Sequence, residues 1–154
     1  MADVQIKVRM DDFSQLNLKA MSADAVSRAL SRAGRNIEEY AKSITPVSRM
    51  FKSIKALPSG TLRDSIVVSP SLKTITIMWT APYAKYADEG TPPHMIIGNP
   101  NLHFYWWRAG KWIRTIAVNH PGYEGHRFSD HMRIVAPQFV REAIIQELQG
   151  MNIP

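Results

Sequence analysis

YAKYADEGT, residues 83–91, is the stretch around which the rest of the chain is most easily placed. Pro82 suits the first turn of a helix because it has no amide hydrogen to leave unpaired, and Gly90 suits the position just past a helix end. The pattern therefore predicts one or two helical turns with two different sides. The apolar side holds Tyr83, Tyr86 and Ala87, and the other side holds Lys85, Asp88 and Glu89. So short a helix needs a surface to pack on, and the strands predicted on either side are the nearest candidate.

The composition indicates one domain, residues 1–154, because a chain of 154 residues that is 45% hydrophobic can bury one substantial core. Cysteine is absent, which excludes a disulfide framework, a thiol nucleophile and a thiolate metal site. The N-terminal residues lack a signal-peptide core, and no run of about 18 apolar residues occurs, so we expect a soluble protein that is not exported. The formal charge of +6 favours phosphate-rich partners without identifying one.

Two elements precede residue 47. Apolar residues alternate with polar ones over residues 4–9, which is typical of a half-buried strand. Residues 22–44 have the period of a helix, with Ser22 as its N-cap, and the helix should stop at Thr45 because Pro46 disfavours helical geometry before it. The predicted apolar stripe of this helix consists of Val26, Ala29, Leu30, Ala33, Ile37, Tyr40, Ala41 and Ile44.

Beyond this helix, residues 47–58 are polar and irregular, which predicts a mobile loop. Residues 62–69 and 74–80 predict a hairpin with a turn at Pro70 and Ser71, and residues 92–101 predict a loop. A second, protruding hairpin is predicted over 102–118, with Ala109 and Gly110 at its tip. A closing helix has Pro137 in its first turn. The predicted fold class is α+β, a long N-terminal helix and a C-terminal helix packed on a mainly antiparallel sheet.

Two groups of side chains allow more than one interpretation. A basic row on the first helix is either a solvated face or a surface for nucleic acid: Arg28, Arg32, Arg35 and Lys42. Three tryptophans near the tip of the second hairpin either pack inside or form an interface patch, because large aromatic side chains supply much of the energy of protein contacts: Trp106, Trp107 and Trp112.

The search for catalytic chemistry finds no strong motif. The densest histidine and carboxylate group is His120, Glu124, His126, Asp130 and His131, and a second group is Asp88, Glu89 and His94. Neither has a spacing that fixes ligands on one helical face, and a metal-dependent hydrolase built on His120, Glu124, His126 and Asp130 remains a third hypothesis. There is no nucleophile elbow, phosphate loop or dinucleotide fingerprint. We therefore expect no enzyme, no catalytic residue, no bound metal and no cofactor.

Four short blocks, taken together, carry a family resemblance. They are ITP at 44–46, SGTLRDSI at 59–66, YAKYADEGT at 83–91 and HPG at 120–122, and they occur in that order over most of the chain. In this order the chain resembles the tail-completion, or head-tail joining, proteins of long-tailed bacteriophages, the family that includes the minor tail protein Z type. The insertion at 47–58 and the length of the second hairpin are departures from the family pattern.

The resemblance implies a structural virion protein of the phage neck, which completes the tail and joins it to the head. It implies a homo-oligomeric ring, a hexamer if it matches the tail. The implied partners are tail-tube, tail-terminator or head-connector proteins, with the host cytoplasm as the place of assembly. A ring requires two different surfaces that meet. The expected contact residues are Arg63, Asp64, Tyr83, Tyr86, Asp88, Glu89, Trp106, Trp107 and Trp112. The alternative is a basic nucleic-acid-binding module that uses Arg28, Arg32, Arg35 and Lys42, and the two can overlap where such a ring encloses DNA.

Overall fold

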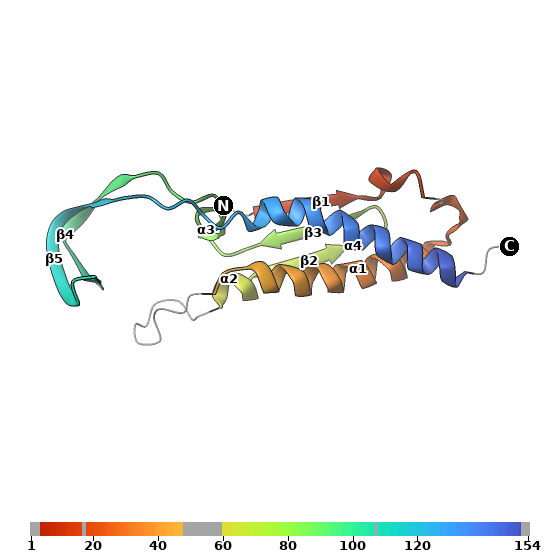
Figure 1. Ribbon diagram of the computed structural model, residues 1–154, viewed down its shortest axis with the longest axis horizontal. Helices are drawn as coiled ribbons and strands as arrows, with labels where there is room; N and C mark the ends of the chain where they lie inside the picture. Colours follow the sequence, from red (N-terminus) through yellow and green to blue (C-terminus); the bar gives the residue numbers. More distant parts are fainter. Residues whose placement is uncertain (1–3, 17, 48–59, 107, 152–154) are drawn as a thin grey trace.

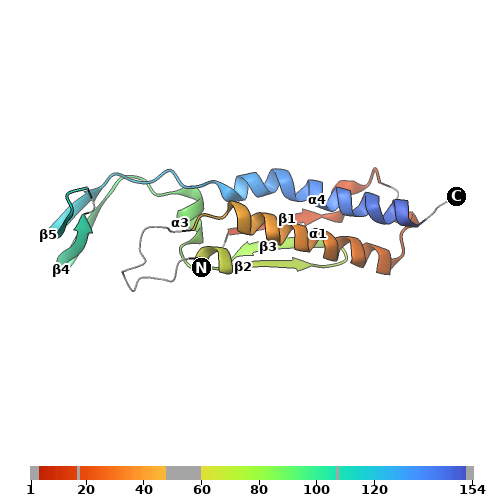
Figure 2. The same cartoon turned by 60° about the horizontal axis from the view of Figure 1, so that its bottom comes forward.

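A computed structural model of the protein describes residues 4–16, 18–47, 60–106 and 108–151. These residues form a core of helices and a sheet, and a two-stranded ribbon projects from one end of that core (Figures 1 and 2). The predicted α+β class, with antiparallel strands and long helices towards both ends of the chain, is confirmed. Trp107 and nearly all of the loop predicted at 47–58 lie outside the described residues.

The core sheet has the strand order β1-β3-β2 and is antiparallel throughout. Its strands are β1 (Val4–Arg9), β2 (Ile66–Pro70) and β3 (Thr74–Trp79). Ile77 lies at the centre of the sheet, opposite Ile6 on one side and Val68 on the other. Burial alternates along β1 and β3, so one face of the sheet carries the apolar residues and the helices cover that face.

Helix α1 (Ala23–Ile44) packs on β2 and on helix α4 (Phe128–Gly150), and α4 also covers β1. The N-cap predicted at Ser22 is confirmed, because its hydroxyl accepts a hydrogen bond of 3.2 Å from the amide of Ala25. Gly34 of α1 is buried beside β2, where a Cβ would lie at an ordinary contact distance of 3.7 Å from the ring of Pro70. Two short 3-10 segments, η1 (Met10–Phe13) and η2 (Leu18–Ala20), connect β1 to α1.

Helix α4 begins earlier than the sequence predicts. Pro137 lies inside the helix instead of in its first turn, and the helix continues through it. A proline in this place removes one helical hydrogen bond. Met132, Ala136 and Val140 are buried on both sides of it, and tertiary packing of this kind provides most of a helix's stability. The packing therefore outweighs the missing bond.

The first predicted hairpin is also partly wrong. Residues 62–64 belong to a single helical turn, α2 (Thr61–Asp64), and the strand begins only at Ile66. Gly60 has a φ of 99°, which turns the chain into α2, and Leu62 is buried beneath it. Helix α2 buries Leu62 and still leaves β2 in register with β3. This single helical turn therefore replaces the predicted start of the strand.

The ribbon consists of β4 (His94–Trp106) and β5 (Lys111–His120), which pair only with each other. The loop predicted at 92–101 is therefore wrong over most of its length, because strand pairing already begins at His94 opposite His120. A register shift between Ile97 and Leu102 accommodates Gly98 and Pro100, residues that are typical of bulges. Gly110 has the predicted positive φ, 62°.

Trp79 is the largest completely buried side chain of the core, and its indole nitrogen needs a partner there. That nitrogen donates a hydrogen bond of 3.0 Å to the hydroxyl of Thr45, which lies just after α1 and is itself buried. The Thr45 hydroxyl in turn donates to the carbonyl of Ala41 at 2.7 Å. Thr45 of the ITP block therefore links the C-terminal end of α1 to the buried indole of Trp79 by hydrogen bonds.

We predict that Thr45→Val lowers the free energy of unfolding by about 1–3 kcal/mol, since it leaves the buried indole N–H without an acceptor. Urea unfolding of the purified protein measures this effect. Thr76→Val is the matched control, because Thr76 lies half-buried on β3 and is expected to change stability by less than about 0.5 kcal/mol. Equal effects of the two substitutions would contradict the role given to Thr45.

Candidate interaction surfaces

The first two blocks of the family resemblance lie beside Trp79 at one end of the core, and the third and fourth blocks pass close to each other at Thr91 and Gly122. Thr45 of the first block bonds to the indole of Trp79, and Ser65 of the second accepts two hydrogen bonds from Thr80, the next residue, at 3.1 and 3.0 Å. Phe128, the first residue of α4, places its ring 4.9 Å from that of Trp79. This end of the core also carries α3 and the base of the ribbon (Figure 1). The blocks therefore share a structural task, which sequence spacing alone does not reveal.

Helix α3 (Ala84–Glu89) holds the start of α4 through Asp88. One carboxylate oxygen of Asp88 accepts a hydrogen bond of 2.9 Å from the amide of Ser129, and the other accepts a short bond from the Ser129 hydroxyl. The backbone carbonyls of Ala87 and Asp88 accept from the amides of His126 and Arg127, both at 2.9 Å. Asp88 thus caps α4 from a distant part of the sequence, while Arg127 at the local N-cap position supplies no side-chain bond.

The two chain segments that enter and leave the ribbon cross at van der Waals distance beside this cap. Thr91 and Tyr123 exchange two backbone hydrogen bonds of 2.7 and 2.8 Å. A Cβ added to Gly90 would lie 1.9 Å from the carbonyl oxygen of Tyr123, and one added to Gly125 would lie 2.2 Å from that of Asp88. We call these two segments, residues 87–92 and 122–129, the ribbon clamp. The clamp fixes the base of the ribbon to the core.

The structure corrects the two sides predicted for residues 83–91. Ala84 and Asp88 are the buried residues of α3, whereas Tyr86 is 57% exposed. Asp88 is only 2% exposed, so it is removed from the set of expected contact residues. The reason is that the surface beneath α3 is the polar N-terminus of α4, which requires an acceptor and not an aromatic ring.

The other expected contact residues of the core lie at its surface. Glu89 pairs with Lys85 at 3.9 Å, and Arg63 lies 3.8 Å from Asp64, with all four side chains exposed. Tyr83 is half-buried against the core. Partial burial raises the pKa of Tyr123 in the clamp, so its phenol stays neutral well above pH 7. These residues border the end of the core from which the ribbon projects.

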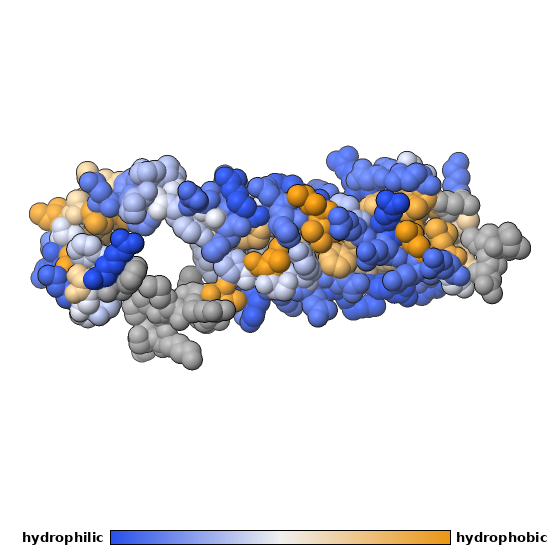
Figure 3. Space-filling model, in the orientation of Figure 1, coloured by the Kyte–Doolittle hydropathy of each residue, from blue (hydrophilic) through white to orange (hydrophobic). Residues whose placement is uncertain are grey.

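None of the described residues of β4 and β5 is buried. Instead the ribbon carries many of the large hydrophobic side chains that the chain exposes to solvent: Met95, Ile97, Tyr105, Trp106, Trp112 and Ile116. Figure 3 shows hydrophobic atoms at the surface of the ribbon, at the left of the view. Trp106 and Trp112 are thus exposed, as an interface patch requires. A hairpin without a core beneath it is marginally stable in water, so this surface is expected to be covered by another molecule.

The two faces of the outer ribbon differ. Phe104 lies opposite Ile113, and together with Ile96, Leu102 and Trp106 these residues line an apolar groove of about 840 Å³, the inner face. The alternating residues form the outer face, with Tyr105 opposite Trp112 and His103 opposite Arg114. The inner face is therefore mainly apolar, with Arg108 bordering its groove and Lys111 opposite Trp106, whereas the outer face combines aromatic rings with Arg114.

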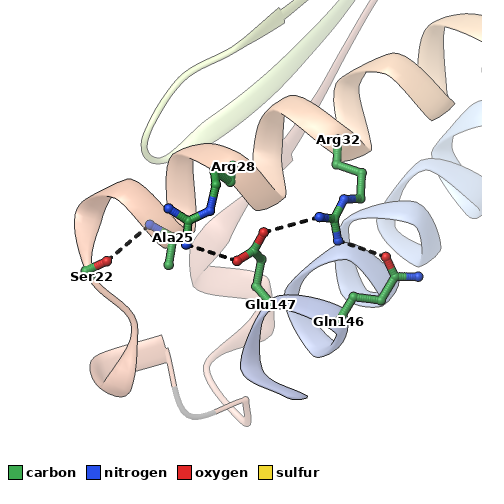
Figure 4. A network of polar contacts seen from close by, with 6 residues as sticks. All are labelled: Ser22, Ala25, Arg28, Arg32, Gln146 and Glu147. Atoms are coloured by element: carbon green, nitrogen blue, oxygen red, sulfur yellow. Dashed lines mark hydrogen bonds and ion pairs between the residues drawn. The ribbon is translucent and has the colours of Figure 1, made fainter. Parts of the chain in front are cut away.

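The basic row of α1 serves a purpose inside the molecule. Glu147 of α4 is buried and contacts Arg28 at 3.2 Å and Arg32 at 3.4 Å, and Arg32 also donates to Gln146 (Figure 4). Lys42 contacts Glu38 on its own helix. Three of the four residues expected to face DNA are thus occupied by intramolecular partners, which weakens that interpretation. Only Arg35 of this row is exposed without a polar partner among the described residues.

We predict that Glu147→Gln lowers the free energy of unfolding by about 1 kcal/mol, a value reduced because both arginines are substantially exposed. The loss should shrink as sodium chloride is added, because salt screens the interaction. Urea unfolding at low and high salt provides the measurement. Glu142→Gln, on the exposed side of α4, is the control and should have no comparable effect.

Histidines and carboxylates do not converge on a metal centre in the part of the chain that the structure describes, where no group of three could hold an ion. His131 is bonded to the Tyr40 hydroxyl at 2.7 Å, and His120 accepts from the amide of Gly122. Asp88 serves α4, as described above. Of the residues proposed for a hydrolase, His120 and Asp130 contact other groups, and the metal-dependent hypothesis gains no support.

Comparison of the chain with models of protein families, with curated proteins and with solved structures gives no match. Among the described residues, no helix combines the length and the apolar character needed to cross a bilayer.

Proposed function

We propose that the protein is a structural virion component of a long-tailed bacteriophage, which completes the tail and joins it to the head as part of a ring-shaped neck. The observation that carries this proposal is the ribbon, which exposes an apolar groove and buries none of its described residues. A ring of identical subunits requires one patch to meet a different patch on the neighbour. The inner face of the ribbon is one such patch, and the core surface around α2 and α3 is its expected counterpart.

The family resemblance supports the same proposal. Each of its four blocks contributes to the end of the core that holds the ribbon: Thr45 through Trp79, Ser65 through Thr80, and Asp88, Gly90 and Gly122 through the clamp. A clamp of this rigidity suits a projecting arm that must reach a neighbouring subunit at a defined angle. The proposed assembly is a hexamer in the virion neck, built in the host cytoplasm, with tail-tube, tail-terminator or head-connector proteins as neighbours.

Native mass spectrometry and negative-stain electron microscopy of the full chain, alone and with the tail-tube protein of the same phage, test the proposal. We expect closed rings, and we expect Phe104→Asp to abolish them because it places a charge in the inner groove. Leu72→Asp, at an exposed turn of the core, is the matched control and should still form rings. A protein that stays monomeric, binds no tail or connector component and can be deleted without loss of tail joining would refute the proposal.

A further inference from the structure

The excess positive charge of the chain is confined to two segments, residues 48–59 and 90–123. Six cations lie in these segments, which contain no Asp or Glu: Arg49, Lys52, Lys55, Arg108, Lys111 and Arg114. Removing them from the total of 19 Lys and Arg leaves 13, which equals the 13 Asp and Glu of the whole chain. The remainder of the protein is thus formally neutral, and within the described structure the uncompensated charge lies on the ribbon.

The outer face of the ribbon carries a continuous row of exposed aromatic rings. The ring of Trp112 lies 5.7 Å from Tyr105, its cross-strand partner, and 5.0 Å from His103. Trp112 is 58% exposed and Tyr105 is 43% exposed, so the rings contact one another and also solvent. Rings fixed in this way by neighbouring strands lose little conformational entropy when a flat ligand stacks on them.

Two cations of the ribbon differ in their partners from three cations of α1. Arg28, Arg32 and Lys42 of α1 are all within ion-pair distance of a glutamate. Lys111 and Arg114 form no ion pair or hydrogen bond with the side chains that the structure describes. Arg114 lies opposite His103, directly beside the aromatic row. The ribbon therefore offers unneutralised charge next to exposed rings.

We propose that the outer face of the β4–β5 ribbon binds a nucleic acid strand. Bases stack on Trp112 and Tyr105, and a phosphate contacts Arg114, the cation of the outer face. Aromatic rings interleaved with cations suit this ligand because every base has a flat face and every linkage a negative charge. An apolar segment of a protein would gain more from the inner face, which has the groove. The proposal moves the nucleic-acid surface from α1 to the ribbon and does not depend on the role in a phage neck.

Fluorescence anisotropy with the full chain and a labelled DNA strand of about 30 nucleotides tests the proposal, with the corresponding duplex as a second probe. We expect affinity for the single strand to fall about 3-fold between about 50 and 200 mM salt, from counterion release at Arg114, the cation of the outer face. Trp112→Ala should weaken binding about 5- to 100-fold at every salt concentration. Arg114→Gln should reduce the salt slope by about one counterion per chain.

Two variants provide matched controls. Trp112→Phe keeps a ring at the same position and should retain most of the affinity. Arg35→Gln removes the exposed cation of α1 and should leave both affinity and salt slope unchanged, which separates a ribbon site from general attraction to a basic protein. Absence of binding at about 50 mM salt, equal losses for Arg35→Gln and Arg114→Gln, or binding of duplex alone with no effect of Trp112→Ala would each overturn the proposal. Capture of a protein by the outer face without any oligonucleotide binding would also overturn it.

Discussion

Gly90→Ala is expected to lower the free energy of unfolding by about 4 kcal/mol or more, the largest effect predicted for any single substitution in this protein. Two causes act together. The residue has a φ of 84° and a ψ of −168°, a conformation that is essentially restricted to glycine. The new Cβ would also lie 1.9 Å from the Tyr123 carbonyl oxygen, and because that oxygen is part of the backbone it cannot turn aside. The ribbon clamp must therefore open or shift.

Thermal unfolding followed by circular dichroism measures this loss, which corresponds to a decrease in Tm of about 10 °C or more for a chain of this size. Two other glycines provide graded controls. Gly110→Ala should cost only about 1 kcal/mol, because the residue has a positive φ but its Cβ meets no atom closer than 4.0 Å. Gly150→Ala should be neutral, since its Cβ would have no neighbour within 4 Å. If Gly90→Ala changes the Tm as little as Gly150→Ala does, the two segments of the clamp do not pack as closely at Gly90 as the structure shows.

The second large effect is expected for Asp88→Ala, about 2–4 kcal/mol of lost stability. The substitution leaves the amide and the hydroxyl of Ser129 buried without an acceptor, and it removes the cap of α4. Because Asp88 joins α3 to α4, hydrogen exchange should increase first in the amides of the opening turn of α4 and in the clamp. Exchange measured by mass spectrometry, together with urea unfolding, tests both parts of this prediction.

Asp130→Ala is the matched control for Asp88→Ala. Asp130 lies one residue beyond Ser129 and contacts Arg133 and Arg127, but its side chain is exposed, so its loss should cost less than about 1 kcal/mol. Asp88→Asn should lie between the two variants, since its amide oxygen can still accept from the Ser129 backbone. If Asp88→Ala and Asp130→Ala lose similar stability, any negative charge near the N-terminus of α4 has this effect, and the buried cap formed by Asp88 has no special role.

The proposed functions place two kinds of contact on opposite faces of one ribbon, and the variants separate them. Phe104→Asp alters the inner groove and should affect assembly, whereas Arg114→Gln alters the outer face and should affect only nucleic acid binding. If the protein assembles into rings but binds no oligonucleotide, the proposal of a ring-forming neck protein is supported and the proposal of nucleic acid binding is refuted. Nucleic acid binding by a strict monomer would do the reverse.

Regular local patterns made much of the core predictable. The strand at the N-terminus, the helix from Ser22 to Thr45 and the turn at Gly110 are found where periodicity, capping and backbone preference place them. Predictions were wrong where proline and glycine were interpreted by their average behaviour. Pro137 lies inside α4, and Gly98 and Pro100 lie in a bulge within a strand. In each case pairing or packing with distant residues outweighed the local preference.

The candidate surfaces were only partly predictable. The sequence left two interpretations of Trp106 and Trp112, packing inside or an interface patch. The structure shows both side chains exposed, which excludes packing inside, and the interface patch stays a prediction. The confinement of the excess charge was visible in the sequence as a run without carboxylates from Gly90 to Tyr123, although its meaning required knowing that this run forms a separate ribbon. The intramolecular partner of Arg28 and Arg32, Glu147, could not be found from the sequence, because more than a hundred residues separate them.

The sequence by itself determined the α+β class, the strand β1, the helix α1 and the total charge, because periodicity, caps and composition act within a few residues of the chain. Only the tertiary structure decided which side of α3 is buried, where α4 begins and which cations remain without partners. The physical reason is the same for all three. A buried polar group must be paired wherever its partner lies in the sequence, and Asp88 with Ser129, like Glu147 with Arg28, meets that requirement across long separations.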